Sequence, residues 1–256
     1  MTTSDRADGR FTGRAKNYAR FRPGYPDAVI SLLRDEADWS EDRAVADIGA
    51  GTGISSELYL RHGNRVWAVE PNAEMRAAAE TLRDHYPRLE VLPGTAENSG
   101  LPDACADFVV AATAFHWFDA DACRVEFSRI AKSHGQVVLM WNKRQTGSPF
   151  LTEYEGLIMR FGTDYKDRWG GQRQGVAGVA SRFFGEGNYH TARMPNLQHL
   201  DREGLAGRLL SSSYSPLPGH PNHEPMLEAL GELFHCFARD GVVTLEYETV
   251  VYWGRP

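Results

Sequence analysis

The stretch Ala44-Val45-Ala46-Asp47-Ile48-Gly49-Ala50-Gly51-Thr52-Gly53 decides the fold of this 256-residue chain. Its apolar first half predicts a buried strand, its glycines predict a tight turn, and residues 54–61 predict the helix that the turn opens. Glycine is required in such a turn because a Cβ would hold a ligand away from the backbone. The stretch therefore predicts a nucleotide-binding loop between a strand and a helix.

The spacing of the glycines excludes two common nucleotide sites. A dinucleotide fingerprint would place its third glycine where Ile54 stands, and a P-loop would need a lysine that this stretch lacks. The carboxylate of Asp47, just before the glycines, favours a ligand that carries an ammonium group over one that carries a pyrophosphate.

A second acid follows the next predicted strand. Residues 65–69 predict that strand, and Glu70 stands at its tip, where a carboxylate can accept both hydroxyls of a ribose. The acids at the two strand tips, Asp47 and Glu70, together favour a ligand that combines an adenosine with a positive charge. They predict S-adenosylmethionine as the cofactor.

Composition and charge limit the class of protein and its partners. The chain is 42% hydrophobic, which is ordinary for a globular protein with one core domain and an elaboration. Its net charge of −6 argues against nucleic acid and anionic membranes as partners and favours a small-molecule substrate. The N-terminus carries no apolar signal and no run approaches a membrane span, so we expect a cytoplasmic protein.

The cysteines and histidines predict no metal site. Cys105, Cys123 and Cys236 are odd in number and lack metal-ligand spacing, so they are expected to be free thiols in a reducing compartment. The histidine-containing stretch 220–224 lies in a proline-containing loop without helical ligand spacing, which favours a solvated loop.

The order of the two motifs resembles the class I S-adenosylmethionine-dependent methyltransferases, whose first motif is an acid followed by Gly-x-Gly-x-Gly and whose second ends in an acid. The resemblance implies an α/β fold: a Rossmann-like, doubly wound seven-stranded sheet with its last strand antiparallel and a helical lid or insert. Residues 189–193 and 242–253 are expected to complete that sheet. We expect four parts: an N-terminal cap segment (1–40), the cofactor-binding core (41–148), a helical lid or substrate region with one strand (149–240) and a C-terminal strand (241–256).

Two further motifs look like the trans-aconitate methyltransferase-like branch. They are Tyr-x-x-x-Arg-Pro-x-Tyr-Pro over residues 18–26 and Phe-His-Trp-Phe over 115–118. Composition alone would make the first an amphipathic helix ended by Pro23. The resemblance implies a cap over the methionine end of the cofactor, with Tyr18 and Tyr25 against the sulfonium or substrate and Arg22 paired with a carboxylate.

Other cofactor contacts follow from the same resemblance. Asn72 is a candidate N-cap, and Met75, one turn later, either packs on adenine or is plain core filler. The loop Gly94-Thr95-Ala96-Glu97 resembles the family's adenine-edge loop. The full set of expected cofactor-binding residues is Tyr18, Arg22, Asp47, Gly49, Ala50, Gly51, Gly53, Glu70, Pro71, Met75, Thr95, Ala96, Glu97, Thr113 and Phe115.

Polar residues at two later strand exits are expected to face the reacting methyl group. His116 follows the fourth strand and is a general base, a positioning group or a packed structural histidine. Residues 125–132 predict a helix and 136–144 the fifth strand, which ends in Asn142 and Arg144; Asn142 either serves the site or terminates the strand. The expected catalytic residues are Tyr18, His116 and Asn142, and the expected substrate contacts are Tyr25, His116, Trp117, Asn142, Arg144 and Tyr214.

The segments around 150–185 and 211–216 predict a substrate lid, because long irregular inserts in compact folds are usually functional. The resemblance implies a small-molecule methyltransferase that methylates a carboxylic acid on oxygen. Two alternatives stay open: a cyclising lyase that converts S-adenosylmethionine into azetidine-2-carboxylate and methylthioadenosine, and a non-catalytic S-adenosylmethionine-binding module.

Overall fold

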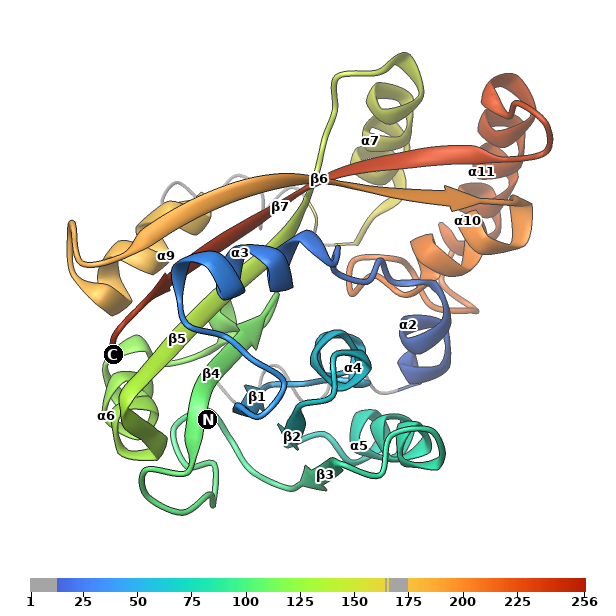
Figure 1. The fold of residues 1–256 in the computed structure, drawn as a ribbon. Coiled ribbons are helices and arrows are strands. Elements are labelled where there is room, and N and C mark those ends of the chain that lie inside the picture. Colours follow the sequence, from blue (N-terminus) through green and yellow to red (C-terminus); the bar gives the residue numbers. More distant parts are fainter. Residues whose placement is uncertain (1–12, 164, 166–174) are drawn as a thin grey trace.

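The computed structural model describes residues 13–163, 165 and 175–256 (Figure 1). Seven strands form one sheet in the order β3-β2-β1-β4-β5-β7-β6. Neighbours among β1 to β5 pair in parallel, and β7 runs antiparallel to both β5 and β6. The predicted sheet with its reversed last strand is confirmed. Its strands are β1 (Ala44–Ile48), β2 (Arg65–Val69), β3 (Leu89–Leu92), β4 (Ala106–Ala112), β5 (Ala131–Arg144), β6 (His190–Leu200) and β7 (Val243–Gly254).

Helices cover both faces of this sheet. Apolar side chains of α3 (Ala28–Glu36) and α4 (Ile54–Arg61) pack on one face, and those of α6 (Ala120–Ile130) and α9 (Gly175–Phe184) pack on the other. Between β1 and β4 the strand order reverses, because the chain first adds β2 and β3 on one side of β1 and then crosses to the other. In open α/β sheets a crevice for ligands lies at this point, beyond the carboxyl ends of the strands.

The boundary between α6 and β5 differs from the prediction of a helix over 125–132 and a strand from 136. Helix α6 begins at Ala120, since the Asp119 side chain caps it by accepting hydrogen bonds from the amides of Asp121 and Ala122. Strand β5 begins at Ala131, which pairs with Ala106 before the register shifts. Residues 132–135 lie in that irregular stretch. Their sequence pattern predicts a loop, whereas the structure has a strand there.

Strand β6 is longer than the predicted 189–193. It pairs with β7 along its whole length, from His190 opposite Trp253 to Leu200 opposite Val243. Pro195 lies within it without disrupting the sheet, because β6 is an edge strand and has a free side.

A second helical cluster lies where β5, β6 and β7 extend past the other strands (Figure 1). Helices α7 (Pro149–Phe161), α10 (Arg202–Leu210) and α11 (His223–Phe237) pack there around Leu245 and Tyr247 of β7. Helix α9, from the expected lid, instead buries Phe183 against Phe115 and Phe127 in the sheet core. Trp169, another residue of the expected lid, lies outside the described residues.

Helix α2 (Ala15–Phe21) bridges the two parts of the molecule, packing against α10 and against α5 (Ala73–Glu80). It ends before Arg22, whose backbone is extended because Pro23 follows. Among the described residues there are also short 3-10 turns at Thr81–Asp84 and Phe115–Trp117. Within the described residues, no helix combines the length and apolarity that crossing a membrane requires.

Candidate functional site

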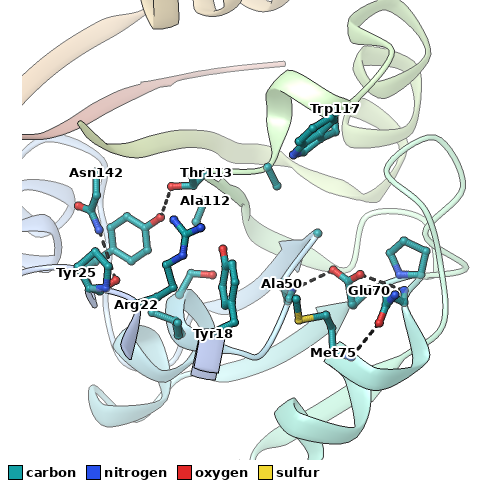
Figure 2. Close-up of a pocket in the computed structure, with 18 of the residues that line it drawn as sticks. Tyr18, Arg22, Tyr25, Ala50, Glu70, Met75, Ala112, Thr113, Trp117 and Asn142 are labelled. Atoms are coloured by element: carbon teal, nitrogen blue, oxygen red, sulfur yellow. Dashed lines mark hydrogen bonds between the residues drawn. The ribbon is translucent and has the colours of Figure 1, made fainter. Parts of the chain in front are cut away.

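A cavity opens at the carboxyl edge of the sheet, at the point where the strand order reverses. Its lining comes from α2 and the segment after it, the glycine loop, the tip of β2, the start of α5 and the ends of β4 and β5. Figure 2 shows Glu70 and Met75 at one end, Asn142 and Tyr25 at the other, and Tyr18 and Arg22 between them. The lining residues are Tyr18, Arg22, Pro23, Tyr25, Gly49, Ala50, Gly51, Ile54, Ser55, Glu70, Pro71, Asn72, Met75, Ala112, Thr113, Ala114, Trp117, Phe118, Asn142 and Arg208.

Glu70 fixes the glycine loop to the tip of β2. One carboxylate oxygen accepts a hydrogen bond from the Gly51 amide (2.9 Å) and the other accepts one from the Asn72 amide (3.0 Å). Asn72 in turn caps α5 by accepting from the Met75 amide (3.0 Å). A carboxylate can accept about four hydrogen bonds, so this anchoring role is compatible with binding ribose hydroxyls as well.

The first two glycines of the loop have left-handed backbones, with φ of +70° at Gly49 and +60° at Gly51. A Cβ on Gly49 would lie 2.7 Å from Cζ of Phe118 and 2.9 Å from Cβ of Ala114, whereas a Cβ on Gly51 would meet no atom within 4 Å. Gly51 thus presents bare backbone to the cavity, and Gly49 lets Phe118 approach the loop.

We expect Gly49→Ala to destabilise the protein more than Gly51→Ala. Both substitutions place an L-residue in the left-handed region, at about 1–2 kcal/mol each. Gly49→Ala also collides with Phe118 and Ala114, which adds about 1–3 kcal/mol of overpacking. Urea unfolding of the two variants measures the difference in free energy of unfolding; equal losses would contradict the packing described for Gly49.

Asp47 lies behind the loop and not among the lining residues. It is fully buried, and its Oδ2 accepts hydrogen bonds from the hydroxyls of Ser55 (2.7 Å) and Ser56 (2.6 Å). Within the described part of the chain, Oδ1 has no hydrogen-bond partner. Burial raises the pKa of Asp47 to about 6, against the opposing effect of the two serines. The carboxylate therefore fastens the end of β1 to the first turn of α4.

The ionisation of Asp47 should make stability fall as pH rises. Its pKa is higher in the folded protein, about 6 against an ordinary 3.8. The stabilisation is therefore complete below about pH 4 and is lost as pH rises through 6, a change of about 3 kcal/mol in the free energy of unfolding. Asp47→Asn keeps an acceptor for both serines and should remove this dependence. Urea unfolding of both proteins between pH 4 and 7 tests it, and parallel pH profiles would contradict it.

The segment after α2 closes one side of the cavity. The guanidinium of Arg22 lies over the ring of Tyr18, 4.8 Å from its centroid, and donates to the Ser211 carbonyl at 3.2 Å. The Tyr25 hydroxyl is hydrogen-bonded to Oγ1 of Thr113 at 2.7 Å. Thr113, at the end of β4, has φ of +54°, an unusual conformation for a β-branched residue. Backbone strain of this kind clusters at functional sites.

A second arginine reaches the cavity from α10. Arg208 is 5% exposed; its Nε donates to the Tyr247 hydroxyl at 2.9 Å and its Nη1 to Oγ of Ser212 at 3.0 Å. In the described residues, no carboxylate lies within ion-pair distance of Arg208 or Arg22, and the Arg22 Nε is buried without a partner. Burial, together with the positive charge of Arg208, lowers the pKa of Arg22. Among the described residues, the cavity wall thus holds two buried cations that pair with no carboxylate.

Asn142 lines the cavity, but its amide bonds to the protein. Its Nδ2 donates to the Gly24 carbonyl at 3.0 Å, and its Oδ1 accepts from Thr249 Oγ1 at 2.6 Å and from Asn196 Nδ2 at 3.1 Å. The expected lining residues that the structure brings together are Tyr18, Arg22, Tyr25, Gly49, Ala50, Gly51, Glu70, Pro71, Met75, Thr113, Trp117 and Asn142.

Several other expected residues lie outside the lining. Phe115 is buried in the core, and Phe118 reaches the cavity in its place. His116 is exposed, with its ring 4.8 Å from that of Trp117 between centroids. Gly53 packs its α-carbon against Leu82, which a Cβ would approach to 2.6 Å.

The expected adenine-edge loop also lies outside the lining. Thr95 and Asn98 bond to each other, Ala96 is buried, and Glu97 accepts from the Asp119 amide at 3.1 Å, which ties the loop to the start of α6.

Arg144 and Tyr214 belong to a neighbouring cluster. Arg144 pairs with Glu155 of α7, and Tyr214 packs edge-on to Tyr165 with 4.8 Å between centroids. Burial opposes ionisation of Tyr214, but the positive charges of Arg144 and Arg208 outweigh it and lower its pKa.

The sequence reasoning missed part of the lining: Pro23, Ile54, Ser55, Asn72, Ala112, Ala114, Phe118 and Arg208. A signal for Arg208 is present. It lies three residues after the buried Leu205, on the same face of α10, so the sequence places a charge on an apolar helix face.

Comparisons with known proteins agree with this geometry. Residues 46–139 match the family described as "Methyltransferase domain". An uncharacterised methyltransferase of Mycobacterium tuberculosis is 36% identical over 151 residues, which span 59% of this chain and 59% of that relative. A malonyl-[acyl-carrier protein] O-methyltransferase of Pectobacterium atrosepticum is 29% identical over 114 residues, covering 44% of this chain and 42% of that protein.

The fold has close counterparts among solved structures. One from Anaeromyxobacter dehalogenans, described as a "putative type II methyltransferase", superposes with a TM-score of 0.67 at 22% identity and covers 92% of this chain and 98% of its own. At that identity the likeness concerns the fold. The chain spans 59% of the length of the first curated relatives, and the family match covers β2, β3, β4 and parts of β1 and β5.

Proposed function

We propose that this protein methylates a carboxylate oxygen of a small organic acid. The premise is that residues 46–139 are a class I S-adenosylmethionine-dependent methyltransferase domain with S-adenosylmethionine as cofactor. The cofactor supplies a methyl group on a positively charged sulfur. The chain must hold that cofactor, hold an anionic acceptor in line with the methyl group and keep water away.

The residues of the cavity fit the cofactor. Gly51 leaves open a space that a Cβ would occupy, and Glu70 stands where ribose hydroxyls can be accepted. Met75 is 3% exposed and lies beside Glu70 at the same end of the cavity, where it supplies an apolar side chain for the adenine (Figure 2). The aromatic rings of Tyr18 and Trp117 provide faces that can stabilise a cation such as the sulfonium.

The pair of buried arginines carries the proposal of an acidic acceptor. Burying an unpaired cation is costly, so a site that keeps Arg22 and Arg208 without a carboxylate among the described residues is suited to an anionic ligand. Guanidinium groups bind carboxylates with two parallel hydrogen bonds, which orients the acceptor as well as holding it.

The exposed position of His116 is consistent with this acceptor. A carboxylate is already ionised at neutral pH and needs no general base, so positioning supplies most of the acceleration. Oxygen is also the atom methylated by the relative named malonyl-[acyl-carrier protein] O-methyltransferase.

The test is to follow nucleoside products by chromatography and mass spectrometry. The protein is incubated with S-adenosylmethionine alone, and then with a panel of mono-, di- and tricarboxylic acids beside their amides. The proposal expects S-adenosylhomocysteine and a methyl ester only when an acid is present. Methylthioadenosine formed without an acceptor would favour the cyclising lyase, and cofactor binding without any turnover would favour a non-catalytic module.

A further inference from the structure

We propose that Asn142, Asn196 and Thr249 form a clasp that positions the segment Arg22–Tyr25 over the cavity and so sets the affinity for the cofactor. The inference rests on the proposed function only in that this cavity binds S-adenosylmethionine; it does not depend on the acceptor. Asn196 and Thr249 do not line the cavity, so they would act through the segment that they hold.

The clasp is built by the register of three neighbouring strands. Asn142 of β5 lies opposite Thr249 of β7, and Asn196 of β6 lies opposite Tyr247, two residues from Thr249. Residues two apart on a strand share a face, so the three polar side chains converge on one side of the sheet. Thr249 is fully buried there.

Hydrogen bonds connect the clasp to one peptide group. The Gly24 carbonyl accepts from Asn196 Nδ2 at 2.8 Å and from Asn142 Nδ2 at 3.0 Å. Asn142 Oδ1 accepts from Thr249 and Asn196, which fixes the orientation of its amide. A second contact from Asn142 Nδ2 reaches the Pro23 carbonyl at 3.5 Å. Asn142 therefore uses both ends of its amide within the protein, which makes it a positioning residue.

The segment that the clasp holds carries functional groups of the cavity. Arg22 precedes the clasped peptide and Tyr25 follows it, and both line the cavity (Figure 2). Other polar attachments of this segment include the Tyr25 bond to Thr113 and the Arg22 bond to the Ser211 carbonyl, and Gln198 Nε2 donates to the carbonyl of the preceding Phe21 at 2.8 Å. If a released segment samples open positions, the apparent affinity falls by the fraction of molecules that remain closed.

The experiment measures the affinity for S-adenosylhomocysteine by calorimetry in variants that do not touch the cavity. Asn196→Ala removes the amide that donates to the Gly24 carbonyl and to Asn142 Oδ1, and Thr249→Val removes the hydroxyl that donates to Asn142 Oδ1 with little change in volume. Each should weaken binding by about 5- to 30-fold, the effect of one or two neutral hydrogen bonds. Thr249→Ser keeps the hydroxyl and should stay within about twofold of the parent.

Arg193→Ala is the matched control. It lies on β6 with an exposed side chain paired to Glu248, away from the clasp, and should bind like the parent. Trypsin gives a second readout: cleavage after Arg20, in α2, should be faster in Asn196→Ala and Thr249→Val than in the control.

The outcomes separate the clasp from the proposed function. Parent-like affinity in Asn196→Ala and Thr249→Val would overturn the clasp, and so would a Thr249→Ser variant as weak as Thr249→Val, because packing and not the hydroxyl would then matter. A parent protein that binds S-adenosylhomocysteine but methylates no acid contradicts the proposed function alone and leaves the clasp tested.

Discussion

Replacing Glu70 with alanine is expected to reduce the affinity for S-adenosylmethionine by roughly 100-fold or more. Hydrogen bonds to a charged group contribute about 1.5–3 kcal/mol each, and a carboxylate at the tip of β2 can accept both ribose hydroxyls. The change also removes the acceptor for the Gly51 and Asn72 amides, so the loop that surrounds the cofactor loses its anchor. Calorimetry with S-adenosylmethionine measures the effect.

Glu90→Ala is the control for that prediction. Glu90 is an acid on the neighbouring strand β3, with half of its side chain exposed and paired with Arg65, and it is not among the residues that line the cavity. This variant should bind the cofactor like the parent. If Glu70→Ala remains folded by circular dichroism and binds with unchanged affinity, the cavity is not the cofactor site.

Replacing Arg208 with methionine is expected to lower kcat/KM for the acid acceptor by roughly 100-fold or more while leaving affinity for S-adenosylhomocysteine within about threefold. Removing one partner of a buried, charge-assisted contact costs about 2–5 kcal/mol. Arg208 bonds to Tyr247 and Ser212 and not to the glycine loop or to the tip of β2, where we place the adenosine of the cofactor, so the loss should fall on the acceptor. Initial rates at saturating cofactor and calorimetry together measure the split.

Two companions sharpen the Arg208 test. Arg208→Lys keeps the charge but not the planar fork, and should recover only part of the activity. Arg202→Met changes an exposed arginine on the same helix and should leave the rate unchanged. A loss of cofactor affinity in Arg208→Met equal to its loss of rate would place Arg208 on the cofactor and remove the main support for an acidic acceptor.

The strand-loop-helix unit was predictable because its determinants are contiguous in the sequence. The run 44–53 contains the strand, the turn and the left-handed glycines, and helix α4 begins directly after it at Ile54. Glu70 was placed by the same logic, since parallel neighbours β1 and β2 bring their carboxyl ends to one edge. The hydrophobic pattern predicted the wrong start for β5, because polar residues 132–135 lie within that strand. The strand pairs with β4 both before and after these residues.

Residues whose role depends on burial were placed less well. Asp47 has the sequence position of a ligand-binding acid, yet its bonds to Ser55 and Ser56 make it the fastening of α4. Phe115 and Phe118 are equivalent in the motif, but one is buried in the core and the other lines the cavity. A pattern of residue types cannot distinguish the two positions, because the direction of each side chain depends on the orientation of the 3-10 turn at Phe115–Trp117.

The sequence by itself determined the first strand, the glycine loop and the cofactor, since each follows from local hydrophobic pattern, backbone sterics and a short motif. The seven-stranded sheet with its reversed last strand followed from the resemblance to the methyltransferase family. Only the tertiary structure decided what surrounds the reacting end of the cavity. Arg22 and the Ser211 carbonyl that it contacts are 189 positions apart, and Asn196 and the Gly24 carbonyl are 172 apart. Such contacts arise from the packing of α2, α10 and the long strands, and their free energies depend on burial that no local pattern encodes.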